Sequence, residues 1–365
     1  METLYDKYAK VLVNYSLGIK EGEKVVISSS YAAEPLLKAV YREAIRAGAH
    51  PIVQTKINGL ERIRYEHSSD DQLEFVHPMR EFMIDNYDAF LNIMAPFNLK
   101  STQSINPKKK RMVAEAGRDI QKKFMKYAAE NRIRWSLCQF PTDAAAQEAN
   151  MGTEEFMDFV ANACYLYHDD PVGKWNEVHE NQQRIVDYLM KRETMHFKSA
   201  DVDVKFSYKG RKWINSDGHN NMPSGEVFTT PVEDSIDGKI RFSYPGIFMG
   251  NEIEDITLEI EDGEVIKWKA EKGQELLDEL FQIPGSRHFG EAAIGTNYGI
   301  KRFIKNMLFD EKIGGTIHMA VGAAYPDTGG TNECSIHWDL LADMKDGGEI
   351  YADSDLIYKD GEFII

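Results

Sequence analysis

The sequence predicts an α/β N-terminal domain with a parallel sheet, followed by a β-rich α+β C-terminal domain. In the N-terminal half, short apolar runs alternate with segments of helical periodicity. Beyond about residue 195, short runs of alternating polarity predominate, separated by turn-forming residues. A chain of 365 residues also has room for two domains of ordinary size. We therefore expect one domain over residues 1–185 and a second over residues 186–365.

The N-terminal half begins with a strand–helix–strand pattern. Residues 24–28 (KVVIS) and 50–54 (HPIVQ) have the apolar character of buried strands, and residues 33–47 between them have helical periodicity. Units of this length form right-handed parallel crossovers. Further strands are expected at residues 89–95 and 134–138, and helices at residues 108–130, 153–167 and 174–191. The chain contains neither GxGxxG after the first strand nor GxxxxGK[S/T], so the sequence gives little support to nucleotide binding.

The C-terminal half carries the signals of antiparallel sheet. Asp237-Gly238 and Asp262-Gly263 separate runs of alternating polarity, and Asp-Gly between such runs is a strong hairpin signal. We expect strands at residues 201–208, 239–244, 254–260, 264–270, 316–321 and 334–340, with one helix near residues 273–281.

Composition and charge exclude several classes of partner. The chain is 42% apolar and 28% charged, with a net charge of −16, which argues against nucleic acid and anionic membranes as partners. No apolar run approaches the roughly 20 residues that span a bilayer. The N-terminus lacks the uninterrupted apolar core of a signal peptide. Three scattered cysteines without a CxxC pair fit a reducing compartment, so we expect a cytoplasmic protein.

Two expected strands near the C-terminus each contain histidine. Side chains two residues apart share one face of a strand, so His337 and Asp339 point the same way and Trp338 points to the other. If residues 316–321 pair with this strand, His318 can join them. Two imidazoles and a carboxylate form a cluster that suits a divalent metal.

Two glutamates upstream extend this candidate site. Glu226 and Glu291 each enter an otherwise apolar or small-residue run as its lone charge. Burial of a bare carboxylate costs several kcal/mol unless it is paired or binds a metal; the alternative is a solvent-exposed glutamate at the start of a strand. The full ligand set of Glu226, Glu291, His318, His337 and Asp339 is enough for two divalent ions roughly 3.5–4 Å apart. The absence of cysteine from this set favours a hydrolytic site over a structural zinc site.

Other catalytic arrangements fit the sequence less well. GxSxG is absent, and Gln183 stands where HExxH requires its second histidine after His179. Cys334 is close to His337 in sequence but projects to the opposite face of an extended strand. The other histidines are treated as structural, with His219 and His288 as weaker functional candidates.

These residues lie in motifs that resemble the M29 family of metallo-aminopeptidases. The matching segments are MPSGEVFTTP (222–231), GEAAIGTN (290–297), DEKIGGTIHMAVGAAYP (310–326) and SIHWD (335–339). Weaker similarity occurs in VNYSLGIKEGEKVVI (13–27) and WSLCQFPTDAAAQEANM (135–151). The resemblance therefore covers nearly the whole chain, in order.

The resemblance implies a catalytic C-terminal domain, a homodimer and hydrolysis of N-terminal residues from peptides with a free N-terminus. It assigns the five residues above as metal ligands and Tyr325 as the active-site tyrosine. The ions would be zinc, cobalt, magnesium or manganese. A water activated by them would attack the peptide carbonyl, Glu226 or Glu291 could take its proton, and Tyr325 could hydrogen-bond the oxyanion. For Tyr325, the alternative is a packed loop aromatic.

Two alternatives remain open on the residues alone. A two-metal hydrolase of another class, an amidase on non-peptide substrates or a phosphoesterase, could use the same ligands. A non-enzymatic domain could retain the cluster for stability only. Turnover of aminoacyl-p-nitroanilides that is lost on chelation and restored by metal would distinguish the aminopeptidase from both.

Overall fold

The computed structural model describes residues 2–365 and divides into two compact units. The first contains the chain up to Trp175 together with Gly218–Pro223, and the second contains Asn176–Asp217 and Ser224–Ile365. Within residues 2–365, no helix has both the length and the apolar character needed to cross a bilayer.

The first unit is built on a parallel sheet, as the strand–helix–strand pattern predicts. Its strands follow the order β2-β1-β3-β4-β8, and every pair in it is parallel. The strands are β1 (Lys24–Ser30), β2 (His50–Lys56), β3 (Ala89–Met94), β4 (Arg134–Gln139) and β8 (Asn221–Met222).

Helices of this unit connect the strands. The segment α1 (Leu4–Lys10) continues into the π-helix η1 (Val11–Ser16), and the 3-10 turn η2 (Tyr31–Ala33) leads into α2 (Glu34–Arg46), which returns the chain from β1 to β2. The other helices are α3 (Leu60–His67), α4 (Asp70–Glu74), α5 (Pro78–Asn86), α6 (Pro107–Ala116), α7 (Arg118–Ala129), α8 (Asp143–Glu148) and α9 (Thr153–Ala163), and α10 (Pro171–Leu189) runs on into the second unit.

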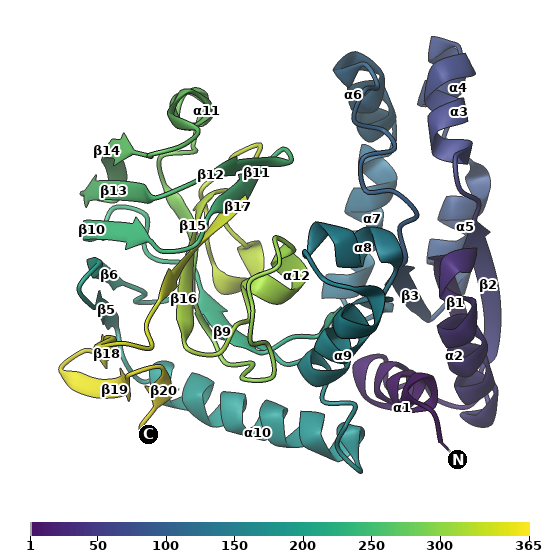
Figure 1. Cartoon of the computed structure of the whole chain (residues 1–365), viewed down its shortest axis with the longest axis horizontal. Helices are drawn as coiled ribbons and strands as arrows, with labels where there is room; N and C mark the ends of the chain where they lie inside the picture. Colours follow the sequence, from purple (N-terminus) through teal and green to yellow (C-terminus); the bar gives the residue numbers. More distant parts are fainter. Residues whose placement is uncertain (1) are drawn as a thin grey trace. The chain divides into compact units, whose positions relative to one another are not determined.

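The second unit contains two antiparallel sheets and a two-stranded ribbon (Figure 1). One sheet has the order β14-β13-β10-β6-β5-β18-β19-β20 and the other the order β17-β16-β15-β9-β7. The first comprises β5 (Thr194–Lys198), β6 (Val202–Ser207), β10 (Asp237–Phe242), β13 (Ile256–Glu261), β14 (Glu264–Lys269), β18 (Glu349–Ala352), β19 (Asp355–Lys359) and β20 (Glu362–Phe363). The ribbon pairs β11 (Gly246–Phe248) with β12 (Asn251–Ile253).

The five-stranded sheet joins segments that are far apart in sequence. It comprises β7 (Ile214–Ser216), β9 (Glu226–Thr229), β15 (Phe289–Gly295), β16 (Thr316–Gly322) and β17 (His337–Asp343). Between β9 and β15 the chain passes through the eight-stranded sheet, the ribbon and α11 (Gln274–Leu280). The short α12 (Met307–Asp310) precedes β16, and the 3-10 turn η3 (Pro326–Thr328) follows it.

One face of the five-stranded sheet belongs to the core of the second unit. Alternate residues of β15, β16 and β17 are buried in that core, among them Ile294, Met319 and Leu340. Because side chains alternate along a strand, the residues between them point to the opposite face. That opposite face carries the candidate site.

Two predicted elements differ from the structure. The helix expected at residues 108–130 is two helices, α6 and α7, because the backbone leaves helical geometry at Gly117 (ψ −4°). The strand expected from residue 334 begins at His337. Gly322, with a φ of +103°, ends β16, and Ala323 N donates a hydrogen bond to Ile336 O at 2.7 Å. The residues before His337 therefore close a loop and do not extend the ladder of β16 and β17.

Candidate metal centre

Four neighbouring strands supply the five predicted ligands. Glu226 opens β9, Glu291 lies in β15, His318 in β16, and His337 and Asp339 in β17. Directly opposed residues of antiparallel strands point to the same face of a sheet. Ala320 is opposite both Glu291 and Asp339, and His318 lies two residues from Ala320. Glu226 is opposite Gly295, four residues after Glu291, so the register places all five side chains on one face.

The ligands form two overlapping groups. In each group, one potential ligand atom per residue lies within 4.8 Å of the others. We call Glu226, Glu291 and His318 the inner group, because all three are buried, and Glu291, His337 and Asp339 the outer group, because His337 and Asp339 are partly exposed. Glu291 belongs to both groups.

The two oxygens of Glu291 face different histidines. Its Oε1 lies 3.4 Å from Nε2 of His318, and its Oε2 lies 3.1 Å from Nε2 of His337. The inner group is completed by Oε2 of Glu226, 3.5 Å from His318 Nε2. The outer group is completed by Oδ1 of Asp339, 3.3 Å from His337 Nε2.

Several of these buried atoms lack a hydrogen-bond partner among the described residues. They are Oε2 of Glu226, Nε2 of His337, Oδ1 of Asp339 and, on the ring of His318, Nδ1. Buried polar atoms are normally satisfied, and each one left unsatisfied costs about 1–3 kcal/mol. All of them except His318 Nδ1 face other members of the inner and outer groups, so the donor set fits divalent cations. In addition, Nδ1 of His337 lies 2.7 Å from Ala323 O, which orients the ring with Nε2 toward the carboxylates.

Burial and mutual attraction set the pKa values of the cluster. Burial raises the pKa of Glu226. Burial would also raise the pKa of Glu291, but the nearby imidazoles of His318 and His337 outweigh it and lower the pKa. Burial would lower the pKa of His318, but Glu291 and Glu226 raise it to about 9. Burial would also lower the pKa of His337, but Asp339 and Glu291 outweigh it and raise the pKa to about 11. In the absence of a cation, the histidines therefore hold protons that neutralise the carboxylates.

Tyr325 lies at the open side of the outer group. It follows β16 directly before η3, its ring centroid is 4.8 Å from that of His337, and the residue is 43% exposed. Partial burial, followed by the charges of Glu291 and Asp339, raises the pKa of the phenol above its usual value. The hydroxyl is therefore protonated at neutral pH and available as a hydrogen-bond donor.

Two charged residues of this face were missed in the sequence. Lys312 is fully buried, its Nζ lies 3.5 Å from Oε1 of Glu226, and it pairs with the neighbouring Glu311. Burial would lower the pKa of Lys312, but Glu226 and Glu311 outweigh it and raise the pKa. Burial raises the pKa of Glu311 to about 8. The available signal was the pair of adjacent charges Glu311 and Lys312, separated by one residue from Gly314-Gly315 and the buried strand that follows.

The weaker histidine candidates lie elsewhere. Nδ1 of His288 lies 3.1 Å from Gly263 O, and the ring of His219 packs 4.7 Å from that of Tyr15 in the first unit. Neither belongs to a ligand group among the described residues. His179, whose neighbouring glutamate resembled a truncated zinc motif, lies 2.5 Å from the carboxylate of Asp217.

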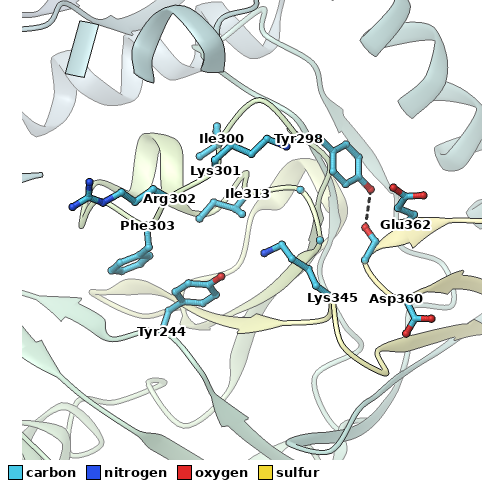
Figure 2. A pocket seen from close by; sticks show the side chains of 13 residues that line it. Tyr244, Tyr298, Ile300, Lys301, Arg302, Phe303, Ile313, Lys345, Asp360 and Glu362 are labelled. Atoms are coloured by element: carbon cyan, nitrogen blue, oxygen red, sulfur yellow. Dashed lines mark hydrogen bonds between the residues drawn. The ribbon is translucent and has the colours of Figure 1, made fainter. Parts of the chain in front are cut away.

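A separate pocket of about 270 Å³ lies in the second unit and is lined in part by Ile313, Gly314 and Gly315, the residues that follow Lys312 in the chain (Figure 2). None of the five predicted ligands lines it. Figure 2 shows Tyr298 and Lys345 on its walls, with the hydroxyl of Tyr298 bonded to Gly361 O at 2.9 Å. A Cβ on Gly314 would lie 2.5 Å from the ring of Tyr298, so the pocket wall packs tightly against this loop.

Fold and site together define a class of protein. Carboxylates and imidazoles without thiolate, partly open to solvent and with unsatisfied atoms that converge, are typical of metal-dependent hydrolases. Comparisons with known proteins narrow this class. Residues 1–363 match the family model described as thermophilic metalloprotease (M29).

Similar proteins of known name agree with this match. The chain is 27% identical to aminopeptidase 2 of Geobacillus stearothermophilus, over 93% of this chain and 92% of that protein. It is 24% identical to aminopeptidase T of Thermus thermophilus, over 98% and 95% of the respective chains. The solved structure of wild-type AmpT from Thermus thermophilus, 22% identical, superposes with a TM-score of 0.84 over 99% of each chain.

The chain belongs to the M29 family of metalloproteases. The resemblance inferred from the four C-terminal motifs is thereby confirmed. The fold class is confirmed as well, since a parallel α/β region precedes a β-rich region and the whole matches the AmpT structure.

Proposed function

We propose that this metal-dependent aminopeptidase hydrolyses the N-terminal peptide bond of peptides with two divalent ions, one in each ligand group. The observation that carries the proposal is the position of Glu291, whose two carboxylate oxygens face His318 and His337 separately. A carboxylate shared in this way is the arrangement expected of a bridge between two cations. Relatives named aminopeptidases over nearly the full chain support the substrate class.

The bound ions would lower the pKa of a water and polarise the scissile carbonyl. Carboxylate and imidazole donors without thiolate accept zinc, cobalt or manganese, and magnesium where oxygen donors prevail. These ions would be held by the five residues of the two ligand groups, Glu226, Glu291, His318, His337 and Asp339.

Two side chains are assigned to proton transfer and charge stabilisation. Glu291 uses both oxygens in the ligand groups, whereas Glu226 belongs to the inner group alone. Burial raises the pKa of Glu226, and the histidines lower that of Glu291, so we assign Glu226 as the proton acceptor, through Oε1, since its Oε2 faces His318 in the inner group. The protonated Tyr325 hydroxyl would donate a hydrogen bond to the oxyanion of the tetrahedral intermediate.

Restriction to a free N-terminus follows from the charge of the outer group. Its Asp339 side chain is 13% exposed and that of His337 is 22% exposed, so this group is the one that a substrate meets. The carboxylate of Asp339 attracts the α-ammonium of a peptide, whereas an internal peptide bond offers no cation at that position.

The experiment is metal analysis of the purified chain together with a panel of aminoacyl-p-nitroanilides. We expect two divalent ions per chain, turnover that chelation abolishes, and recovery when metal is returned. A matched N-acetylated substrate should not be cleaved, because it lacks the α-ammonium. Turnover of phosphoesters in place of aminoacyl substrates would overturn the proposal.

We also propose that the protein is a cytoplasmic homodimer. The family resemblance supports the dimer, and three free cysteines in the chain fit a reducing compartment. Light scattering of the purified protein tests the dimer, and fractionation of the source cells tests the compartment.

A further inference from the structure

Lys312 is a fully buried cation on the same face of the sheet as the metal ligands. Its side chain is 0% exposed, and its Nζ lies 3.5 Å from Oε1 of Glu226. Glu311, next to it in the chain, forms a second ion pair with it. A buried ammonium is costly unless it is paired, and here both partners belong to the surroundings of the inner group.

The backbone holds Lys312 in this position. Its carbonyl accepts a hydrogen bond from Asn297 N at 2.9 Å, and Gly314 N donates to Asn297 O at 3.0 Å. A Cβ on Gly315 would lie 2.7 Å from the side chain of Lys345, on the pocket wall seen in Figure 2. The loop is thus fixed both from the sheet and from the pocket side.

The same asparagine also holds the segment before Glu226. Its Nδ2 donates to Ser224 O at 2.7 Å, and Thr296 N donates to Gly225 O at 2.8 Å. Lys312 and Glu226 are therefore attached to one anchor, Asn297. This network fixes the backbone of Lys312 relative to the segment that carries Glu226.

The two ligand groups differ in their relation to this charge. The inner group contains Glu226, which contacts Lys312 directly. Among the described residues, the outer-group carboxylates of Glu291 and Asp339 form ion pairs only with the histidines of the cluster, and Asp339 is influenced by the charge of Lys312 without an ion-pair contact to it. A fixed positive charge repels a divalent cation, and the repulsion grows as the distance falls.

We propose that Lys312 is a positioning residue that makes the two metal sites unequal, so that the outer group binds its cation more tightly and fills first. The lysine holds Oε1 of Glu226, which leaves Oε2 for the inner cation, and its charge weakens that cation's binding. This inference rests on the proposed two-ion function and adds the order in which the ions are held.

The first experiment uses the unmodified chain. Full-length protein stripped with chelator is given one equivalent of Zn²⁺ and crystallised, and anomalous scattering locates the metal. We expect zinc between His337 and Asp339, with the position beside His318 filling only at two equivalents. Equal occupancy, or filling beside His318 first, would overturn the inference. Failure to bind zinc at all would instead overturn the proposed function.

The second experiment isolates the charge of Lys312. Glu311→Gln retains the lysine without its neighbouring carboxylate, and Glu311→Gln/Lys312→Met removes both, so the two variants differ by one cation. Zn²⁺ titration against a competing chelator should show the weaker binding step roughly tenfold or more tighter in the double variant. The stronger step should change less.

A merely structural lysine gives a different result. In that case, the affinity of the weaker binding step in the double variant equals the affinity in Glu311→Gln or falls below it. Either result contradicts the inference. Lys305→Met serves as the control, because Lys305 pairs with Glu252 outside the ligand groups and should leave both steps unchanged. If the double variant does not fold, the order of filling in the unmodified chain still decides.

Discussion

Glu291 divides its carboxylate between two histidines: Oε1 lies 3.4 Å from Nε2 of His318 and Oε2 lies 3.1 Å from Nε2 of His337. These histidines are on adjacent strands, β16 and β17, and Glu291 is on β15 at the other side of β16. The inner and outer groups are therefore joined through one residue. Loss of that residue should affect both groups, whereas loss of a residue at the end of the cluster should affect one.

Glu291→Gln should bind fewer than one ion per chain and lose roughly a hundredfold or more in kcat/KM, because an amide cannot bridge two cations with two anionic oxygens. Asp339→Asn should lose the outer ion and retain the inner one at high metal concentration. Metal content by mass spectrometry and steady-state kinetics measure both. Glu275→Gln, on the exposed surface of α11, is the control and should be unaffected. Full metal content in Glu291→Gln would contradict the bridging role.

Tyr325→Phe should lower kcat by roughly 10²–10³-fold and leave KM and metal content close to those of the unmodified protein. Phenylalanine retains the ring contact with His337, whose centroid lies 4.8 Å away, and removes only the hydroxyl. Kinetics with an aminoacyl-p-nitroanilide, together with a thermal unfolding curve, measure the effect. An unchanged kcat would show that the tyrosine is a packing residue of the loop.

Metal binding should release protons at neutral pH. Without metal, the pKa of His318 is raised to about 9 and that of His337 to about 11, so both rings are protonated at pH about 7. A cation requires the unprotonated nitrogen, and the apparent affinity should therefore rise as the pH rises toward about 9. Calorimetric titration in two buffers of different ionisation enthalpy measures the protons released. A binding heat that is the same in both buffers would rule out protonated histidines in the metal-free site.

Gly225→Ala should destabilise the protein and disturb the inner group. Gly225 has a φ of +122°, and a Cβ there would lie 2.7 Å from Cβ of Asn297. Strain of this kind costs about 1–3 kcal/mol, and relief of it would displace the adjacent Glu226. Thermal unfolding and metal titration report the two effects.

Gly210→Ala is the matched control for this substitution. Gly210 also has a positive φ, +78°, but a Cβ there would meet no atom within 4 Å. Gly210→Ala should therefore lower the stability of the protein without a change in its metal affinity. Equal metal binding by Gly225→Ala and the unmodified protein would show that the loop before Glu226 adapts without moving its carboxylate.

The sequence contains enough to predict the alternation of the sheet that bears the site. Period-two spacing places His337 and Asp339 on one face and Trp338 on the other, and the structure has Trp338 buried in the core of the second unit. Local periodicity was sufficient here because both ligands lie on one strand. Strand pairing between β16 and β17 then brings in His318.

Long-range pairing and loop geometry were not predictable in the same way. Nothing local indicates that β9 pairs with β15, since several strands of the other sheet intervene between them. The burial of Lys312 likewise depends on hydrogen bonds of its loop to Asn297 and not on any periodic pattern. Charged residues this close to two consecutive glycines normally indicate an exposed turn. The structure instead turns this charge inward, where Glu226 and Glu311 compensate it.

The position of β17 has a consequence for the local dynamics of the site. This strand is at the edge of its sheet and pairs there with β16, yet it supplies His337 and Asp339. Local opening of this edge would carry both side chains away from Glu291, while the inner group stays on the interior strands. A cation bound in the outer group would oppose that opening, so the metal would also hold the edge of the sheet closed.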